Sequence, residues 1–404
     1  MRPSFFYGWV VVVVCVLATL STGEVVWSFG VFFTSFEQQF DWSRQVVSSG
    51  YTLMIVGHSV SAIIAGRLAD RGAARSALLG SALVGGTAII LSSQINDSLQ
   101  FRLLFLCIGL GAGASHSIPN SVVQRWFAGR PHAGVALASV MAGIGIGALI
   151  FAPLFRYLIS TIGWRTTLVF AGIAFFMMVG TAGVLRRPYA NDLAPKSSGQ
   201  HEMDTKTGQP KKARQMLLSA PFLTLLAVTF VAFLAFQVTL VHLVPYASDV
   251  GLSPGMAAAA LGLFGGASVP GRFVAGVLAE RIGWRKTLSV ALGGAATAML
   301  GLIFVSQDWM LFSAVLLLGV CHGMRAVAVF GLLGRFFGTV ALGELIGFTI
   351  AMGQLMSAPG PYIVGYWYDL GNSYSLMFAV IAAALCFAAL MVLRTSTNQM
   401  QREV

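Results

Sequence analysis

The chain has 404 residues, of which 57% are hydrophobic and only 10% are charged, and its formal net charge is +11. Soluble globular proteins devote about a quarter of their residues to charge, so this composition excludes an ordinary soluble enzyme and a disordered chain. It predicts an integral membrane protein. The positive charge does not indicate a nucleic-acid partner, because no water-exposed domain is predicted that could carry a basic patch.

Twelve apolar segments follow one another along the chain, each close to the roughly 20 residues that cross a bilayer core about 30 Å thick. In the first half they are predicted at 8–33, 45–66, 76–94, 100–124, 133–159 and 166–185. In the second half they are predicted at 219–246, 256–279, 287–306, 310–334, 343–368 and 374–393. We therefore expect an all-α membrane protein with twelve transmembrane helices.

Residues 186–217 interrupt the apolar pattern with Lys, Ser, Gly, Pro and Gln, and they are predicted to form a cytoplasmic linker. The linker separates two expected six-helix bundles, residues 1–185 and 218–404. Most of the 25 Lys and Arg residues fall in loops on the side that carries both termini. The positive-inside rule therefore places both termini in the cytoplasm, in a plasma membrane that we expect to be a bacterial inner membrane.

The four cysteines lie inside apolar runs, and their spacing fits neither a disulfide framework nor a zinc site. No metal and no cofactor is predicted. Motifs for nucleotide hydrolysis and for membrane hydrolases are also missing from the sequence, so the chain is not expected to be an enzyme.

The two halves repeat each other at a spacing of 210 residues. Residues 66–71 (GRLADR) match residues 276–281 (GVLAER), and residues 125–127 (RWF) match residues 335–337 (RFF). The spacing recurs between Gly143 and Gly353. These matches predict a duplicated six-helix unit with pseudo-symmetric halves.

Duplicated halves of this kind resemble the major facilitator superfamily of secondary transporters, whose signature between helices 2 and 3 is similar to residues 66–72 (GRLADRG). Residues 7–11 (YGWVV), 28–33 (SFGVFF) and 125–127 (RWF) resemble the monocarboxylate transporter family and its bacterial relatives. The resemblance implies the major facilitator fold and transport by alternating access. It also implies that Arg272 stands where the family has an arginine that pairs with a substrate carboxylate.

The sequence departs from that family at two positions. Animal members have a lysine near the end of helix 1 where this chain has Trp27, and an aspartate one turn before the arginine where this chain has Ser268. The proton-coupling pair of the family is therefore not present as such. The resemblance leaves proton coupling open.

Three ionisable residues are predicted well inside membrane spans: Glu24, Arg272 and Arg325. Burying a charge in the bilayer costs several kcal/mol, so each is a functional candidate. Together they leave one positive charge in excess, which a carboxylate substrate would balance by accepting a bidentate pair of hydrogen bonds. The alternatives are a snorkelling side chain for Arg272 and a fixed ion pair with Glu24 for Arg325.

Polar residues near these charges complete the predicted binding cavity. His322 shares a helical face with Arg325, and His116 shares one with Asn120. These histidines either exchange a proton near neutral pH or simply bond to their neighbours. Trp27 either stacks on the substrate or belongs to an interfacial belt. The predicted substrate-binding residues are Arg272, Arg325, His322, His116, Asn120, Glu24, Trp27 and Gln354.

Two regions are predicted to act as gates. In the loops of the repeat, glycine permits close helix approach and Asp70 can accept hydrogen bonds that break as the bundles rock. On the other side of the membrane, His242 and Tyr246 flank Pro245. Pro359 and Pro361 predict a broken or kinked helix whose freed carbonyl groups need partners. The predicted gating residues are Asp70, Arg71, Gly66, Glu280, Arg281, His242 and Tyr246.

The sequence as a whole favours a secondary transporter of a small organic anion, a monocarboxylate in the first instance. Two alternatives stay open. One is efflux of amphipathic or aromatic compounds, in keeping with the 29 Phe residues and the replaced Lys and Asp. The other is a membrane sensor that has kept the fold without transporting. The expected partners are the anion, protons if transport is coupled, and the lipid bilayer, with the chain acting as a monomer.

Overall fold

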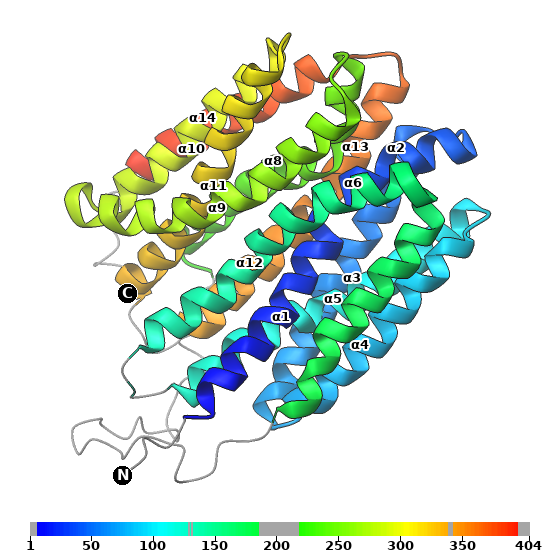
Figure 1. The fold of residues 1–404 in the computed structure, drawn as a ribbon. Coiled ribbons are helices and arrows are strands. Elements are labelled where there is room, and N and C mark those ends of the chain that lie inside the picture. The colour runs from blue at the N-terminus through cyan, green and yellow to red at the C-terminus, as the bar shows by residue number, and fades with distance from the viewer. Residues whose placement is uncertain (1–5, 128–129, 131, 186–217, 338–341, 395–404) are drawn as a thin grey trace, which may run out of the picture. The chain divides into compact units, whose positions relative to one another are not determined.

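The computed structural model describes residues 6–127, 130, 132–185, 218–337 and 342–394. In these residues all regular secondary structure is helical and no strand occurs (Figure 1). The predicted all-α architecture is confirmed for this part of the chain. Long apolar runs form helices because each helix satisfies its own backbone hydrogen bonds away from water.

The helices before the predicted linker are α1 (Gly8–Trp27), α2 (Phe29–Phe40), α3 (Arg44–Asp70), α4 (Ala74–Leu91), α5 (Ser98–Trp126) and α6 (Ala133–Gly180). Two short 3-10 segments, Ser92–Gln94 and Thr181–Val184, follow α4 and α6. The helices after the linker are α8 (Ala220–Asp249), α9 (Pro254–Ile282), α10 (Trp284–Ile303), α11 (Asp308–Phe337), α12 (Leu342–Ser357), α13 (Pro359–Asp369) and α14 (Tyr374–Arg394).

Ten helical stretches of the described chain are long and apolar enough to cross a membrane. The element α6 consists of two helices divided at Gly163, whose backbone is not helical (φ 80°, ψ 158°). The predicted spans 133–159 and 166–185 lie on either side of this residue, and the second ends in the 3-10 segment Thr181–Val184. The predicted span 343–368 is divided into α12 and α13, of 16 and 11 residues, each shorter than a full crossing. The count of twelve spans and the orientation of the termini stay predictions.

Local sequence explains where several helices begin and end. Asp97 caps α5 by accepting hydrogen bonds from two backbone N–H groups of its first turn, at 2.8 and 2.9 Å. Ser253 caps α9 directly before Pro254, the residue best suited to a first helical position. Gly72 and Gly283 follow α3 and α9 with φ angles of 80° and 82°, a conformation that side chains disfavour.

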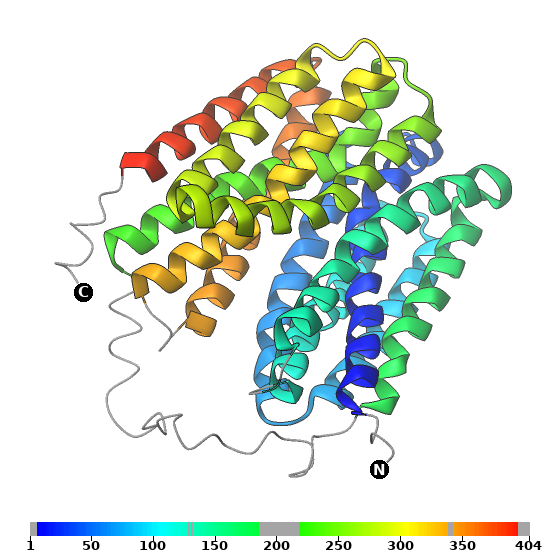
Figure 2. The ribbon, with the colours of Figure 1, turned by 60° about the vertical axis from the view of Figure 1, so that its left-hand side comes forward.

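By their contacts the residues form two compact units. The first unit is Met1–Phe32 with Leu53–Asp204, and the second is Phe33–Thr52 with Thr205–Val404. In the first unit α1 and α4 both pack against α5 and α6. In the second unit α9 and α10 pack against α11, and α10 also packs against α14, drawn in red in Figure 2. The second unit thus includes most of α2 and the first turns of α3, and the predicted domain boundaries stay a prediction about the duplicated halves.

Close helix contacts repeat at the same spacing as the sequence. A methyl group on Gly109 would collide with the carbonyl oxygen of Met54, and one on Gly319 would collide with that of Phe264. The same relation holds for Gly113 with His58 and Gly323 with Ser268, whereas methyl groups on Gly143 and Gly353 would meet the side chains of Thr19 and Thr229. In each case the glycine recurs 210 residues later, and the position of its partner shifts by the same 210 residues. The repeat is therefore a repeat of helix packing as well as of loop motifs.

Large apolar side chains are exposed on both units, among them Leu83 and Phe170 in the first and Phe273 and Phe387 in the second. Water would not tolerate so much exposed hydrocarbon, whereas the interior of a bilayer would cover it. The exposed surface thus agrees with the composition, and both indicate a multi-pass membrane protein.

Candidate functional site

Two arginines and a histidine gather inside the second unit. Arg272 lies on α9, and His322 and Arg325 lie one turn apart on α11. The two helices approach closely because Gly271 and Gly323 face backbone carbonyl oxygens of the opposite helix, where a methyl group would collide. The structure therefore brings together three residues predicted from the sequence, which we call the arginine cluster.

The arginine cluster carries positive charge in a place with limited access to water, because Arg325 is buried and Arg272 is half-buried. Arg272 is close enough to Arg325 for the two charges to repel each other. Arg325 is only 6% exposed, its Nε atom has no hydrogen-bond partner, and it forms no ion pair within the residues described. Its guanidinium lies 4.6 Å above the ring of Phe233. A cation–π contact offsets only part of the cost of burying a charge, so this place favours an anion.

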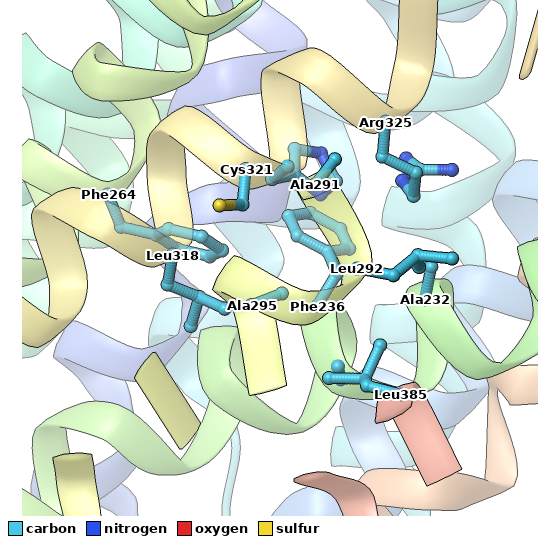
Figure 3. Close-up of a pocket in the computed structure, with 12 residues that line it drawn as sticks. Ala232, Phe236, Phe264, Ala291, Leu292, Ala295, Leu318, Cys321, Arg325 and Leu385 are labelled. Atoms are coloured by element: carbon cyan, nitrogen blue, oxygen red, sulfur yellow. The ribbon is translucent and has the colours of Figure 1, made fainter. Parts of the chain in front are cut away.

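Aromatic rings surround the arginine cluster. The ring of His322 stacks on Phe236 at 4.3 Å with an interplanar angle of 21°, and Phe264 meets it edge-on at 6.0 Å. With Arg325 these rings line a cavity of about 20 Å³ inside the unit (Figure 3). That volume holds about one water molecule, so this cavity is too small for an organic substrate. It does place apolar walls directly beside the charged groups.

In the first unit, His116 on α5 meets His58 on α3. The Nδ1 atom of His116 and the Nε2 atom of His58 are 3.2 Å apart, so one ring donates a hydrogen bond to the other. Asn120 is tied to the same turn, because its amide donates to the carbonyl oxygen of His116 at 3.1 Å. Sequence reasoning selected His116 and Asn120 but not His58, although His58 also lies inside an apolar run.

Glu24 and Trp27 lie near the end of α1 in the first unit. Glu24 is 0% exposed, and neither of its carboxylate oxygens has a hydrogen-bond partner among the described residues. Trp27 is 5% exposed, which is inconsistent with a place in a lipid-facing belt. An ion pair between Glu24 and Arg325 would join residues of different units and stays a prediction.

The break between α12 and α13 has the polar partners that the sequence calls for. Gln237 on α8 donates from Nε2 to the carbonyl oxygen of Gln354 at 3.1 Å and also to the hydroxyl of Ser357. The predicted broken helix is therefore confirmed, and its freed carbonyl has a partner. Gln354 takes part through its backbone. Gln237 was missed, although a glutamine inside an apolar run is itself a signal.

The most extensive polar network in the second unit centres on Arg44, at the start of α3. Its Nε donates to Glu37 at 2.9 Å, and Nη1 and Nη2 donate to the two carboxylate oxygens of Asp249 at 2.6 and 2.7 Å. Nη1 also donates to the hydroxyl of Tyr374 at 2.8 Å, and the guanidinium lies 3.9 Å above the ring of Tyr368. We call these five residues the Arg44 network.

The predicted gating residue His242 continues the Arg44 network. Its Nε2 lies 2.8 Å from the carbonyl oxygen of Pro361, which can only accept, so Nε2 carries the proton. Its Nδ1 is then the acceptor for the hydroxyl of Tyr374 at 3.0 Å. The hydrogen bonds therefore run from Arg44 through Tyr374 and His242 to Pro361.

The first turn of α3 is also held by Asp369, the last residue of α13. Its carboxylate oxygens accept from the backbone N–H groups of Arg44 and Gln45 at 3.0 and 2.8 Å. An anion at a helix N-terminus is favourable because it meets unpaired N–H groups and the positive end of the helix dipole. None of these partners of Arg44 was predicted, since they come from four separate segments of the chain.

Tyr246 lies one turn from His242 but faces other residues. Its hydroxyl donates to the carbonyl oxygen of Leu302 on α10, and its ring packs edge-on against Tyr374 at 5.9 Å and Phe378 at 5.1 Å. The pair predicted to act as a gate is therefore divided. His242 is hydrogen-bonded to the Arg44 network through Tyr374, and Tyr246 joins α8 to α10.

The repeat residues 66–70 and 276–281, predicted to lie in loops, instead form the last turns of α3 and α9. A methyl group on Gly66 would meet no described atom within 4 Å, so the close approach expected at this glycine does not occur in this conformation. Arg71, Glu280 and Arg281 are exposed. The side chain of Asp70 lies outside the described residues. A contact that sequence reasoning missed is nearby, where Arg125 donates from Nη1 to the carbonyl oxygen of Ala69 at 2.8 Å.

These features agree with the comparison to known proteins. The family model of the Major Facilitator Superfamily matches residues 15–361, and the chain belongs to this superfamily of membrane transporters, which are not enzymes. Two similar relatives are Monocarboxylate transporter 12 of Xenopus laevis and Monocarboxylate transporter 13 of Rattus norvegicus. The first is 24% identical over 96% of this chain and 89% of its own length. The second is 26% identical over 95% of this chain and 87% of its own length.

Solved structures show the same fold at lower identity. The structure of a D-xylose-proton symporter matches 96% of this chain and 98% of its own with a TM-score of 0.74 at 16% identity. That of a nucleoside transporter matches 94% of this chain and 99% of its own with a TM-score of 0.76 at 10% identity. The predicted resemblance to monocarboxylate transporters is confirmed by the named relatives, and the major facilitator fold by the structures.

Proposed function

We propose that the protein is a secondary active transporter of a small organic anion, a monocarboxylate, that works by alternating access as a monomer in a bacterial inner membrane. The observation that carries the proposal is the arginine cluster, in which the buried Arg325 and the half-buried Arg272 repel each other. The names of the relatives support the same substrate class. A carboxylate substrate would balance the positive charge of the arginine cluster while it is bound.

Arg272 is the proposed carboxylate ligand, because a guanidinium matches two carboxylate oxygens in a planar bidentate pair. Arg325 and His322 would complete the positive surroundings. On the first half, Glu24, His116, Asn120 and Trp27 are proposed cavity residues, and on α12 Gln354 is proposed as another. In this mechanism the substrate binds between two halves, residues 1–185 and 218–404, which rock about it.

The rings beside the arginine cluster favour a carboxylate with an apolar or aromatic body. Phe233 and Phe236 contact Arg325 and His322 within 4.6 Å, and Phe264 closes the same wall at 6.0 Å from His322. These rings also support the second candidate function, efflux of amphipathic or aromatic compounds. The transport rates of phenylpyruvate and lactate distinguish an aromatic from a small aliphatic substrate. Only phenylpyruvate would bind more tightly through contact with the rings.

The Arg44 network is the proposed gate on the predicted outer side. Residues 33–52 belong to the second unit by contact, yet they continue directly into α1 and the rest of α3, which belong to the first. Opening toward the outside would therefore require the bonds of Arg44 to Asp249 and Tyr374 to break. His242 would lose its partner Tyr374 in the same movement. Gly66, Asp70, Arg71, Glu280 and Arg281 stay the proposed gate residues of the inner side.

Proton coupling, if it operates, has two proposed sites. Glu24 is a fully buried carboxyl group, and the His58–His116 pair shares one hydrogen bond between two rings. Two adjacent imidazoles take up a first proton more easily than a second, since the two positive charges would repel. The pair could thus carry one proton per cycle and replace the Lys and Asp that the family pattern has elsewhere.

The test is uptake of radiolabelled lactate, pyruvate and phenylpyruvate into proteoliposomes, with and without an inward proton gradient. We expect Arg272→Ala to abolish uptake while the purified protein keeps its helical content and elution volume. Phe273→Ala is the matched control, because Phe273 is the next residue on α9 and is 66% exposed. The control should transport like the wild type.

Uptake by Arg272→Ala at the rate of the wild type would refute the role of Arg272. Absence of uptake of all three acids by folded wild-type protein would contradict the uptake of monocarboxylates. Release of aromatic acids from preloaded vesicles by the wild-type protein would then support the efflux function.

A further inference from the structure

The ends of four helices enclose a second cavity in the second unit, away from the arginine cluster. It has a volume of about 320 Å³ and lies where α9 and α11 end and α10 begins, beside the last turn of α14. Three cationic residues line it: Arg285, Lys286 and Arg335. We call it the basic cavity.

The charge of the basic cavity is not balanced by its own wall. No carboxylate is among the residues that the structure shows lining it. Arg285 is held in place, since it donates from Nε to the carbonyl oxygen of Val392 at 3.3 Å and from Nη2 to that of Leu393 at 2.5 Å. Lys286 and Arg335 are exposed. Three cations around one space attract an anion, because an anion relieves their mutual repulsion.

Apolar residues form the remainder of the wall. Trp284, Leu332 and Phe336 all line the cavity. A site for a free inorganic ion would need only polar groups, whereas these side chains suit a ligand that is charged at one end and apolar at the other. Trp284 is also the first residue of α10, whose N-terminus has no side-chain cap and adds a partial positive charge.

The corresponding place in the first half is built differently. Trp126, which stands 210 residues before Phe336, is covered by the rings of Phe6 at 6.2 Å and Tyr7 at 5.6 Å. Tyr7 donates to the carbonyl oxygen of Val184 at 2.6 Å. Aromatic side chains therefore fill the first place, while the second is open and basic. The second half therefore has the basic cavity at a place that aromatic side chains fill in the first half.

We propose that the basic cavity binds the phosphate group of an anionic phospholipid, with the glycerol and upper acyl chain against Trp284, Leu332 and Phe336. The positive-inside orientation puts the cavity at the cytoplasmic surface, where the leaflet carries anionic lipids. The site is distinct from the proposed substrate site. It would tie the ends of α9, α10 and α11 to a lipid, next to the loop of the repeat.

The test measures lipid binding alone, so its outcome is independent of transport. Full-length protein purified in neutral detergent is titrated with phosphatidylglycerol, and bound lipid is counted by native mass spectrometry. Each surface cation contributes about fivefold to the affinity for an anionic lipid, so the double variant Lys286→Gln with Arg335→Gln should bind about 20- to 30-fold more weakly. Arg67→Gln with Arg75→Gln is the matched control, because both are exposed where α3 ends and α4 begins, the equivalent place in the first half.

Equal loss of phosphatidylglycerol binding in both double variants would overturn the proposal, since it would show only a general effect of net charge. Equal binding of phosphatidylcholine to the wild type would also overturn it. In a separate arm, inorganic phosphate at millimolar concentration should not displace phosphatidylglycerol. Displacement that depends on Lys286 and Arg335 would assign the cavity to a free anion and contradict a lipid. Selective loss in the Lys286 and Arg335 variant, without displacement, supports the proposal.

Discussion

Arg44 and Arg325 lie in the same unit, and each is 6% exposed, yet their surroundings are opposite. Every nitrogen of the Arg44 guanidinium has a partner, with two carboxylates, a hydroxyl and a ring around it. Arg325 has the ring of Phe233 and the repulsion of Arg272. Its Nε has no hydrogen-bond partner among the residues that the structure covers.

The difference shows that burial alone does not tell what a membrane arginine does. A buried charge with full partners stabilises one conformation, because removing a partner leaves another charge exposed to the low dielectric. A buried charge with few protein partners is costly to the free protein and is retained for something that binds it. Arg44 therefore fits a conformational role and Arg325 a binding role.

The largest effect expected from this comparison is that of Arg325→Met, which removes the charge and keeps an unbranched apolar side chain. Uptake should fall about 100-fold, since a buried charge-assisted contact is worth about 3 kcal/mol. The thermal stability of the detergent-solubilised protein should be unchanged or higher, because an uncompensated charge has been removed. Arg325→Lys, the control that keeps the charge but loses the planar fork, should retain part of the uptake.

A loss of thermal stability in Arg325→Met as large as that from truncating a core residue would contradict the proposed difference between Arg325 and Arg44. It would mean that Arg325 is held by protein partners after all. Unaltered uptake would remove Arg325 from the proposed binding site.

Arg44→Met should have the opposite effect on stability. It leaves the carboxylates of Glu37 and Asp249 without their cation, and we expect a loss of about 2 kcal/mol in the free energy of unfolding. The value is smaller than for a fully buried pair because these side chains are 29% and 30% exposed and water screens them. Thermal unfolding of both variants in detergent is the measurement. Arg44→Met should lower the unfolding temperature, whereas Arg325→Met should leave it unchanged or raise it.

The same network predicts a change in accessibility. Ser48 is 0% exposed and lies one turn beyond Arg44 on α3. In a Ser48→Cys background, adding Asp249→Asn should increase labelling by an impermeant maleimide from the predicted outer side, because the gate opens more often. Labelling that does not respond to Asp249→Asn would show that the Arg44 network is a static brace. Asp308→Asn, at the start of α11, controls for loss of an acidic charge.

A smaller effect is expected from the helix contact that positions the arginine cluster. Gly323→Ala forces a methyl group against the carbonyl oxygen of Ser268 and should cost about 1 to 3 kcal/mol of stability. Gly66→Ala is the matched control, since a methyl group there meets no described atom within 4 Å. It should gain up to about 1 kcal/mol from the better helix propensity of alanine. Equal stability of the two variants would show that α9 and α11 can separate freely.

The smallest expected effect concerns coupling. Replacing His58 or His116 with Gln keeps a hydrogen-bonding side chain but removes the shared proton. We expect uptake without a gradient to stay within twofold of the wild type and stimulation by an inward proton gradient to fall severalfold. Measurement of both in one preparation of proteoliposomes separates coupling from binding. Full stimulation in both variants would transfer the coupling role to Glu24.

Much of the helical architecture was predictable, because each membrane span carries its own signal of about twenty apolar residues. The break at Pro359 was predictable for the same reason, since proline acts on its own turn. The separation of spans 133–159 and 166–185 was also predictable, because Gly163, the non-helical residue that divides α6 (φ 80°, ψ 158°), lies between them.

The candidate site was predicted in its charges and missed in its partners. Arg272, Arg325 and His322 stand out because an ionisable group in an apolar run is rare. Glu37, Asp249, Asp369 and Tyr374 do not, since they lie near the ends of predicted spans, where polar residues are common. Their role depends on being brought to one guanidinium from distant parts of the chain.

The sequence by itself determined the class of protein, the helical spans, the duplication at 210 residues and the charges placed inside the membrane. These follow from local hydrophobicity and from residue identity, which need no knowledge of neighbours. Only the tertiary structure decided which buried charges are paired. It surrounded Arg44 with carboxylates and left Arg325 beside a ring. The physical reason is that a charge acts on whatever lies within a few ångströms, and helix packing alone decides what that is.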